Sequence, residues 1–245
     1  MQSYNLLRQQ EKIVQPSDRN ALSTGRTVGI LLLFQLVAAL TLPFILSKPI
    51  TVGSPAFLTA GAEHSFQIRS AVLLSFVGSA LTLCLGITTF NIFRLYRKSN
   101  ALLFIVVCAV SCAMDLVHAG TILTLLSVSK EFVASGGVDS KLYQVVGVAA
   151  TAARRSAHIT QLLAIGAWMF VFYISLFRFR LIPIVLAGIG MIGVTLQFIG
   201  VTLMMLLGYS TIGEMAMPLL PIQITVAVWL IVKGFNKATL KSAVT

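Results

Sequence analysis

Long apolar runs are the feature that most limits what this chain can fold into. A helix of about 20 residues crosses the roughly 30 Å hydrocarbon core of a bilayer. Runs long enough for this lie near 27–47, 70–93, 101–128, 157–177, 181–208 and 215–235. Lipid offers the backbone no hydrogen-bond partners, so each run is predicted to be a helix. The sequence therefore predicts an all-α, polytopic transmembrane helix bundle with about six spans.

The composition argues against a soluble domain. Hydrophobic residues make up 57% of the 245 residues and charged residues 10%, whereas soluble domains carry roughly 25% charged residues. The net charge of +11 would suggest nucleic acid in a soluble protein. Here the basic residues gather at the ends of the apolar runs, which favours a role in membrane orientation. The predicted surroundings are a lipid bilayer, with no nucleic-acid partner.

Lysine and arginine placement predicts the direction of the spans. One side of the membrane receives Arg8, Lys12, Arg19, Arg26, Arg94, Arg97, Lys98, Arg178, Arg180, Lys233, Lys237 and Lys241. The other side receives Lys48, Arg69, Lys130 and Lys141. Cytoplasmic loops carry the excess of such residues, so both termini are predicted to be cytoplasmic. The expected parts are a tail (1–26), a six-helix transmembrane domain (27–236) and a second tail (237–245).

Glycine and proline mark the expected breaks between spans. Lys48 to Gln67 and the segment around Ser135 to Gly137 are predicted to be loops. The fourth helix is expected to begin as early as Tyr143, because few helix breakers follow that residue. Pro218 and Pro221 are expected to bend or loosen the start of the last span. In the fifth span, close helix approach is expected at Gly188, Gly190 and Gly193.

Ionisable and polar residues within or next to the spans are the candidates for a site. A charge in lipid costs several kcal/mol, so such residues usually face the bundle interior and often mark function. The candidates are Arg69, Asp115, His118, Arg154, Arg155, His158, Gln161 and Glu214. Counting residues from the cytoplasmic ends of the spans puts all of them in the outer half of the bundle or at its outer surface.

Together these residues predict an outward-facing polar pocket between the second, third, fourth and sixth spans. Its basic and acidic walls would suit a small anionic or zwitterionic ligand, or a lipid head group. One alternative is a structural or accessory subunit, of a homo-oligomer or a larger membrane complex, in which an arginine of the fourth helix neutralises Asp115. Another is a membrane-embedded enzyme that uses the Asp, His and Glu side chains. We favour binding over the structural role, and both over enzyme chemistry.

Cofactor motifs are absent from the sequence. His118 and His158 are weak metal candidates, because the chain has no HxxxH or HExxH pattern. No Walker loop, GxSxG elbow or Rossmann glycine pattern occurs. Cys84, Cys108 and Cys112 lie inside apolar runs and are interpreted as small packing residues. No cofactor is predicted.

Short motifs at the helix junctions resemble one family. They are Ile68–Arg69, Phe93 to Leu102 (FRLYRKSNAL), Leu176 to Arg178 with Leu181 to Pro183, Gly213 to Met215, and Val228 to Asn236 (VWLIVKGFN). Together they resemble the bacterial membrane family DUF4386 over most of the chain after Arg26. The resemblance implies a multi-pass protein of the bacterial cytoplasmic (inner) membrane and brings no established activity. Asp115 departs from this pattern, in which an arginine-rich stretch is expected.

Overall fold

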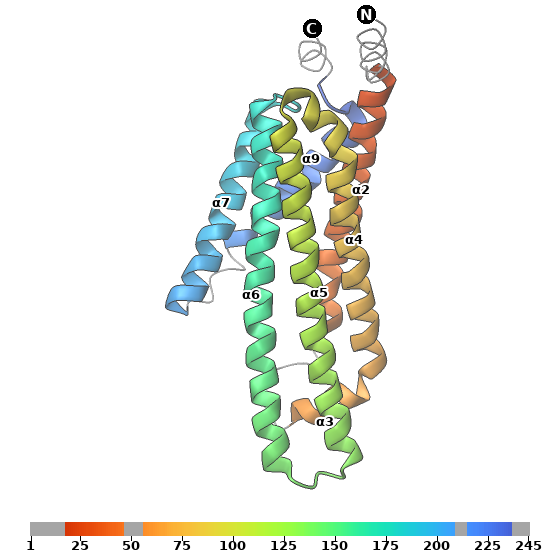
Figure 1. Ribbon diagram of the computed structural model, residues 1–245, viewed down its shortest axis with the longest axis vertical. Helices are drawn as coiled ribbons and strands as arrows, with labels where there is room; N and C mark the ends of the chain where they lie inside the picture. Colours follow the sequence, from red (N-terminus) through yellow and green to blue (C-terminus); the bar gives the residue numbers. More distant parts are fainter. Residues whose placement is uncertain (1–17, 47–55, 209–214, 237–245) are drawn as a thin grey trace, which may run out of the picture.

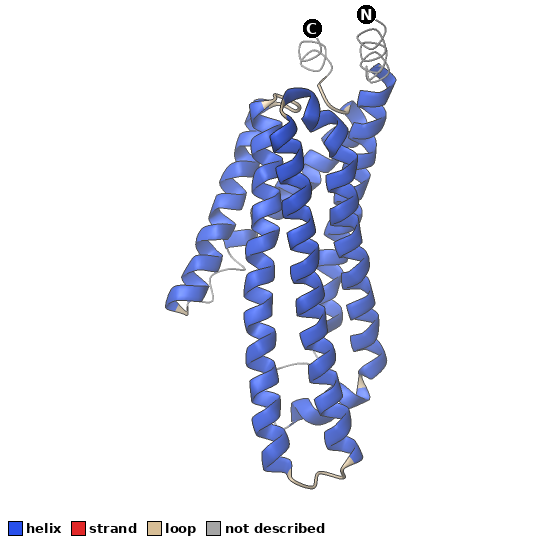
Figure 2. Cartoon of the chain, viewed as in Figure 1, coloured by secondary structure: helices blue, strands red, loops and turns tan. Residues whose placement is uncertain are grey.

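The computed structural model describes residues 18–46, 56–208 and 215–236 of the chain. These residues form helices and connecting turns, with no strand among them (Figure 2). The helices are α2 (Asp18–Leu46), α3 (Ala56–Glu63), α4 (Ser65–Tyr96), α5 (Lys98–Ala134), α6 (Ser140–Arg178), α7 (Ile184–Leu207) and α9 (Leu219–Lys233). The predicted fold class, a polytopic helix bundle, is confirmed.

Five helices are long and apolar enough to cross a membrane: α2, α4, α5, α6 and α7. The sixth apolar helix, α9, has 15 residues and rises about 22 Å, less than the roughly 30 Å of a hydrocarbon core. Residues 215 and 216 are also helical, but a turn at 217 and 218 interrupts the run, and α9 itself begins at Leu219 with Pro218 as its N-cap. Proline fits the first turn of a helix, where its missing N–H would have no partner anyway.

The three longest helices extend beyond the other helices at one end of the bundle. With 32, 37 and 39 residues, α4, α5 and α6 rise about 48 to 58 Å, which exceeds the thickness of a hydrocarbon core. Figure 1 shows them running past α2, α7 and α9 at the lower end of the view. The early start expected for the fourth long helix is confirmed, since α6 begins at Ser140.

The first and last described helices meet at one end of the bundle. A Cβ on Gly25 would lie 2.7 Å from Cα of Gly234, and Arg26 Nε donates to the Ile231 carbonyl at 3.2 Å. The start of α2 and the end of α9 therefore lie side by side (Figure 1).

The two predicted loops differ in outcome. The turn between α5 and α6 is confirmed, with Gly136 and Gly137 at positive φ. Of the loop expected over 48–67, residues 48–55 lie outside the described residues, and the remainder is wrong, because α3 forms there and α4 begins at Ser65. Gly61 does not break α3. Instead it lets α3 approach α5, where an added Cβ would lie 2.7 Å from Ser129 Oγ. Ser129 Oγ donates to the Leu58 carbonyl.

Two apolar cores lie at different heights along α4, α5 and α6. The larger, at the upper end, includes Phe93, Phe104, Trp168, Phe172 and Tyr173. The smaller, at the lower end, is built from Leu58, Ile68, Ile122, Leu125 and Leu126. Each long helix passes from one core to the other, and the polar residues of interest lie between the two.

Candidate functional site

The buried face of α5 is apolar toward both ends of the helix and polar in between. Phe104 and Cys108 belong to the larger core, Ile122 belongs to the smaller, and Asp115 and His118 lie between them. All five are at positions three to seven residues apart, the spacing of one helix face. Asp115 is 8% exposed and His118 is 4% exposed. The polar residues therefore continue the interior stripe of the helix and do not face lipid.

The Asp115 carboxylate is held by two neutral donors from the neighbouring helices. Ser79 Oγ of α4 donates to Oδ2 at 2.9 Å, and Gln161 Nε2 of α6 donates to Oδ1 at 2.8 Å. Asp115 thus links three helices at one height. The sequence alternative in which an arginine neutralises Asp115 is not what the contacts show, since both described partners are uncharged.

The side-chain amide of Gln161 connects Asp115 to His158 by hydrogen bonds. The carboxylate only accepts, so Gln161 turns its amide N–H groups toward Asp115 and its oxygen toward His158. His158 Nδ1 lies 3.0 Å from Gln161 Oε1 and therefore carries the hydrogen of this bond. In the neutral ring this leaves Nε2 as the acceptor. Asp115 therefore selects the tautomer of a histidine on another helix.

His118 packs against His158 without sharing its hydrogen bonds. The two ring centroids are 4.9 Å apart and the planes meet at 34°. Both ring nitrogens of His118 are buried and have no hydrogen-bond partner among the described residues, and the same holds for Nε of Arg154. Arg154 precedes His158 by one helical turn and lies within electrostatic reach of both histidines.

The structure brings together five of the eight residues predicted for the site: Asp115, His118, Arg154, His158 and Gln161. With Ser79 they form what we call the polar cluster. Arg69 and Arg155 are exposed and lie outside it. Glu214 lies outside the described residues. Whether the polar cluster opens toward the outer face stays a prediction.

The sequence did not lead us to Ser79, or to a second set of hydrogen-bonded polar side chains next to it. Thr82, three residues further along α4, accepts from Gln35 Nε2 of α2 at 3.4 Å. Gln35 Oε1 in turn accepts from Gln223 Nε2 of α9 at 3.3 Å. The available signal was the spacing of Ser75, Ser79 and Thr82, which places small polar residues on one face of an apolar helix.

Metal-binding side chains do not gather in the part of the chain that the structure describes. No group of three or more His, Cys, Asp or Glu side chains there is close enough to hold an ion. The cysteines of the described helices are free thiols, with Cys108 buried in the larger core.

Comparison with known proteins gives one match. The family model of DUF4386, described as a domain of unknown function, matches residues 27–234, which is most of the chain. No curated protein and no solved structure matches. The matched region runs from α2 to the end of α9 and so includes the whole bundle with its polar cluster. The chain therefore belongs to the DUF4386 family of proteins of unknown function.

Proposed function

We propose that this multi-pass membrane protein binds a small anionic or zwitterionic molecule, or a lipid head group of that charge, at the polar cluster. The observation that carries the proposal is the set of three buried nitrogens, Arg154 Nε and both ring nitrogens of His118, that lack a partner among the described residues. Each unpaired buried polar group costs about 1–3 kcal/mol. A ligand with acceptor oxygens would pair Arg154 Nε and the N–H of the His118 ring, and a hydroxyl or ammonium group on it would donate to the other ring nitrogen.

The charges of the polar cluster support a ligand with one or two charged ends. Arg154 supplies a cation, and Asp115 supplies an anion that neutral donors hold in place. Arg154 and Gln161, which touches Asp115, are seven residues apart on α6, or about 10 Å along the helix. An acidic group would lie toward Arg154 and the histidines, and the cationic end of a zwitterion would lie toward Asp115.

Soluble head-group analogues test the proposal on the detergent-purified protein. Glycerol 3-phosphate serves as the anionic probe, glycerophosphoethanolamine as the zwitterionic probe and glycerol as the neutral control. We expect calorimetric titration to show saturable binding of the two charged probes and none of glycerol. Arg154→Gln should weaken both charged probes at least tenfold, about 1.4 kcal/mol. Asp115→Asn should weaken only the zwitterion.

Arg155→Gln is the matched control, because Arg155 is the next residue but is exposed. It should leave both affinities unchanged. The proposal fails if neither probe binds the wild-type protein, or if the two arginine variants lose affinity equally. In that case the polar cluster is better explained as a structural link between α4, α5 and α6.

We also propose that the protein resides in the bacterial cytoplasmic membrane with both termini in the cytoplasm. The support is the placement of lysine and arginine at the end where α2 begins and α9 ends. Lys141→Cys, in a variant without the native cysteines, places a thiol near the turn between α5 and α6. A membrane-impermeant thiol reagent added outside intact cells should label it. Labelling only after lysis would reverse the orientation.

A further inference from the structure

A cavity of about 820 Å³ lies at the opposite end of the bundle from the turn between α5 and α6. It opens between the connection from α6 to α7 and the end of α9. Its lining residues are Arg180, Ile182, Pro183, Ile184, Trp229, Lys233, Gly234, Phe235 and Asn236. None of these belongs to the polar cluster, so the cavity is a separate feature of the fold.

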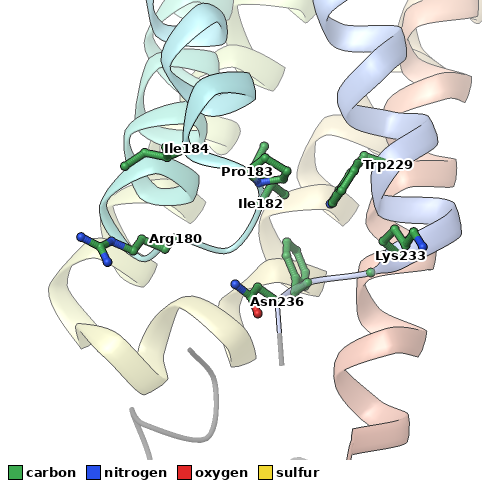
Figure 3. Close-up of a pocket in the computed structure, with 9 residues that line it drawn as sticks. Arg180, Ile182, Pro183, Ile184, Trp229, Lys233 and Asn236 are labelled. Carbon is green, nitrogen blue, oxygen red and sulfur yellow. The ribbon is translucent and has the colours of Figure 1, made fainter. Parts of the chain in front are cut away.

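The cavity has an apolar wall and a cationic rim. Figure 3 shows Ile182, Pro183 and Trp229 around its centre, with Arg180 on one side and Lys233 on the other. Ile182 and Phe235 are buried, whereas Arg180 and Lys233 are exposed. No acidic residue occurs among the described lining residues. Two basic residues therefore flank an apolar cavity from opposite sides, with their charged ends directed away from its centre (Figure 3).

The two walls of the cavity are tied together by the fold. The Asn236 backbone N–H donates to the Leu181 carbonyl at 2.8 Å, which joins the end of α9 to the connection before α7. Gly234 adopts φ +69°, and a Cβ there would lie 2.9 Å from the Leu22 side chain of α2. Glycine tolerates this conformation and this close approach where other residues would not. The shape of the cavity thus depends on packing among α2, α6, α7 and α9.

The cavity also lies where charge and aromatic residues mark a membrane interface. Arg26, Arg94, Arg97, Lys98 and Arg178 lie at the same end of the bundle. Tryptophan is enriched at the level of lipid head groups, and Trp229 lines the cavity. Clustered Lys and Arg beside spans attract anionic head groups.

We propose that this cavity binds a phosphate group, carried most effectively by an anionic phospholipid. Arg180 and Lys233 are exposed, and their long side chains turn toward the rim from either side to pair with the phosphate oxygens. Trp229 and Pro183 pack against the glycerol and the first acyl methylenes. A free phosphate would use only the rim, whereas the lipid uses the rim and the apolar wall together.

Native mass spectrometry of the wild-type protein tests the binding. We expect phosphatidylglycerol to be retained in preference to phosphatidylcholine. The double variant Arg180→Gln/Lys233→Gln should bind it at least tenfold more weakly. Lys98→Gln/Arg178→Gln is the matched control, because it removes the same charge from exposed residues at the same end but outside the cavity. Equal losses in both double variants would overturn the proposal, as would no preference in the wild type.

Fluorescence separates the two sources of phosphate. The chain has two tryptophans, so Trp168→Phe leaves Trp229 as the only one. Phosphatidylglycerol brominated near the head group should quench Trp229 fluorescence more than brominated phosphatidylcholine does. Adding inorganic phosphate should not reduce this additional quenching. If inorganic phosphate abolishes the additional quenching, the ligand is a soluble phosphate. No excess quenching, in a protein that also retains no phosphatidylglycerol, would refute the site.

Discussion

The larger core and the polar cluster are both buried, but they hold their helices together by different means. In the core, the ring centroid of Phe172 lies 5.7–6.5 Å from the ring centroids of Phe93, Phe104, Trp168 and Tyr173. In the polar cluster, the described links between helices are single hydrogen bonds from Ser79 and Gln161 to Asp115, together with the packed histidine rings. Packing dominates one region and polarity the other.

The difference indicates what each region is for. Interhelical hydrogen bonds inside membrane proteins contribute only about 0.6 kcal/mol on average, whereas loss of a buried aromatic side chain costs about 3–5 kcal/mol. The core is therefore expected to contribute more to the stability of the bundle than the polar cluster does. A cluster that adds little stability and leaves nitrogens of Arg154 and His118 unpaired is what the proposed binding function predicts.

Truncating the centre of the core should produce the largest effect on stability. Phe172 is 1% exposed and its ring contacts four other aromatic rings. We expect Phe172→Ala to lower the free energy of unfolding by about 3–5 kcal/mol, measured by SDS titration in mixed micelles. Phe76→Ala is the control, since Phe76 is 55% exposed on the outside of α4. Similar losses in both variants would remove the distinction between core and surface.

Overfilling the core should have an intermediate effect. A Cβ on Gly190 of α7 would lie 2.3 Å from the Tyr173 ring, so Gly190→Ala should destabilise by about 1–3 kcal/mol. Gly120→Ala is the matched control, because a Cβ at that position of α5 meets nothing within 4 Å. The same SDS titration should find Gly120→Ala nearly neutral. A neutral Gly190→Ala would mean that α7 can shift away from α6 at little cost.

The sequence predicted the core and the site to different extents, for physical reasons. Apolar length predicts helices because lipid allows few other structures, and glycine spacing predicted the contact of Gly190 and Gly193 with neighbouring side chains. Charge in an apolar run predicted Asp115, His118 and His158 as interior residues. The partner on α4 was harder to identify, since Ser79 resembles an ordinary small residue of a membrane helix and Arg69 carries the more conspicuous charge.

The short helix before α4 was also harder to predict, because the sequence around it contains residues that usually interrupt helices. The stretch before α4 contains Pro55 and Gly61, and both residues usually interrupt helices. Pro55 lies outside the described residues, and Gly61 faces Ser129 without interrupting α3. Whether glycine ends a helix or allows a close contact depends on the neighbouring helix, and that information is not local in the sequence.

Cutting the polar links should have the smallest effect on stability and so sharpens the comparison most. The coupling between Asp115 and Gln161 can be isolated by a double-mutant cycle with Asp115→Asn and Gln161→Leu. We expect a coupling of about 0.6 kcal/mol, and no more than about 1.7 kcal/mol, by SDS titration. Ser79→Ala should cost no more than that, because it removes one hydrogen bond from a carboxylate that keeps another. A coupling as large as the loss in Phe172→Ala would make the polar cluster a principal support of the bundle, and the case for binding would then depend on the ligand titrations alone.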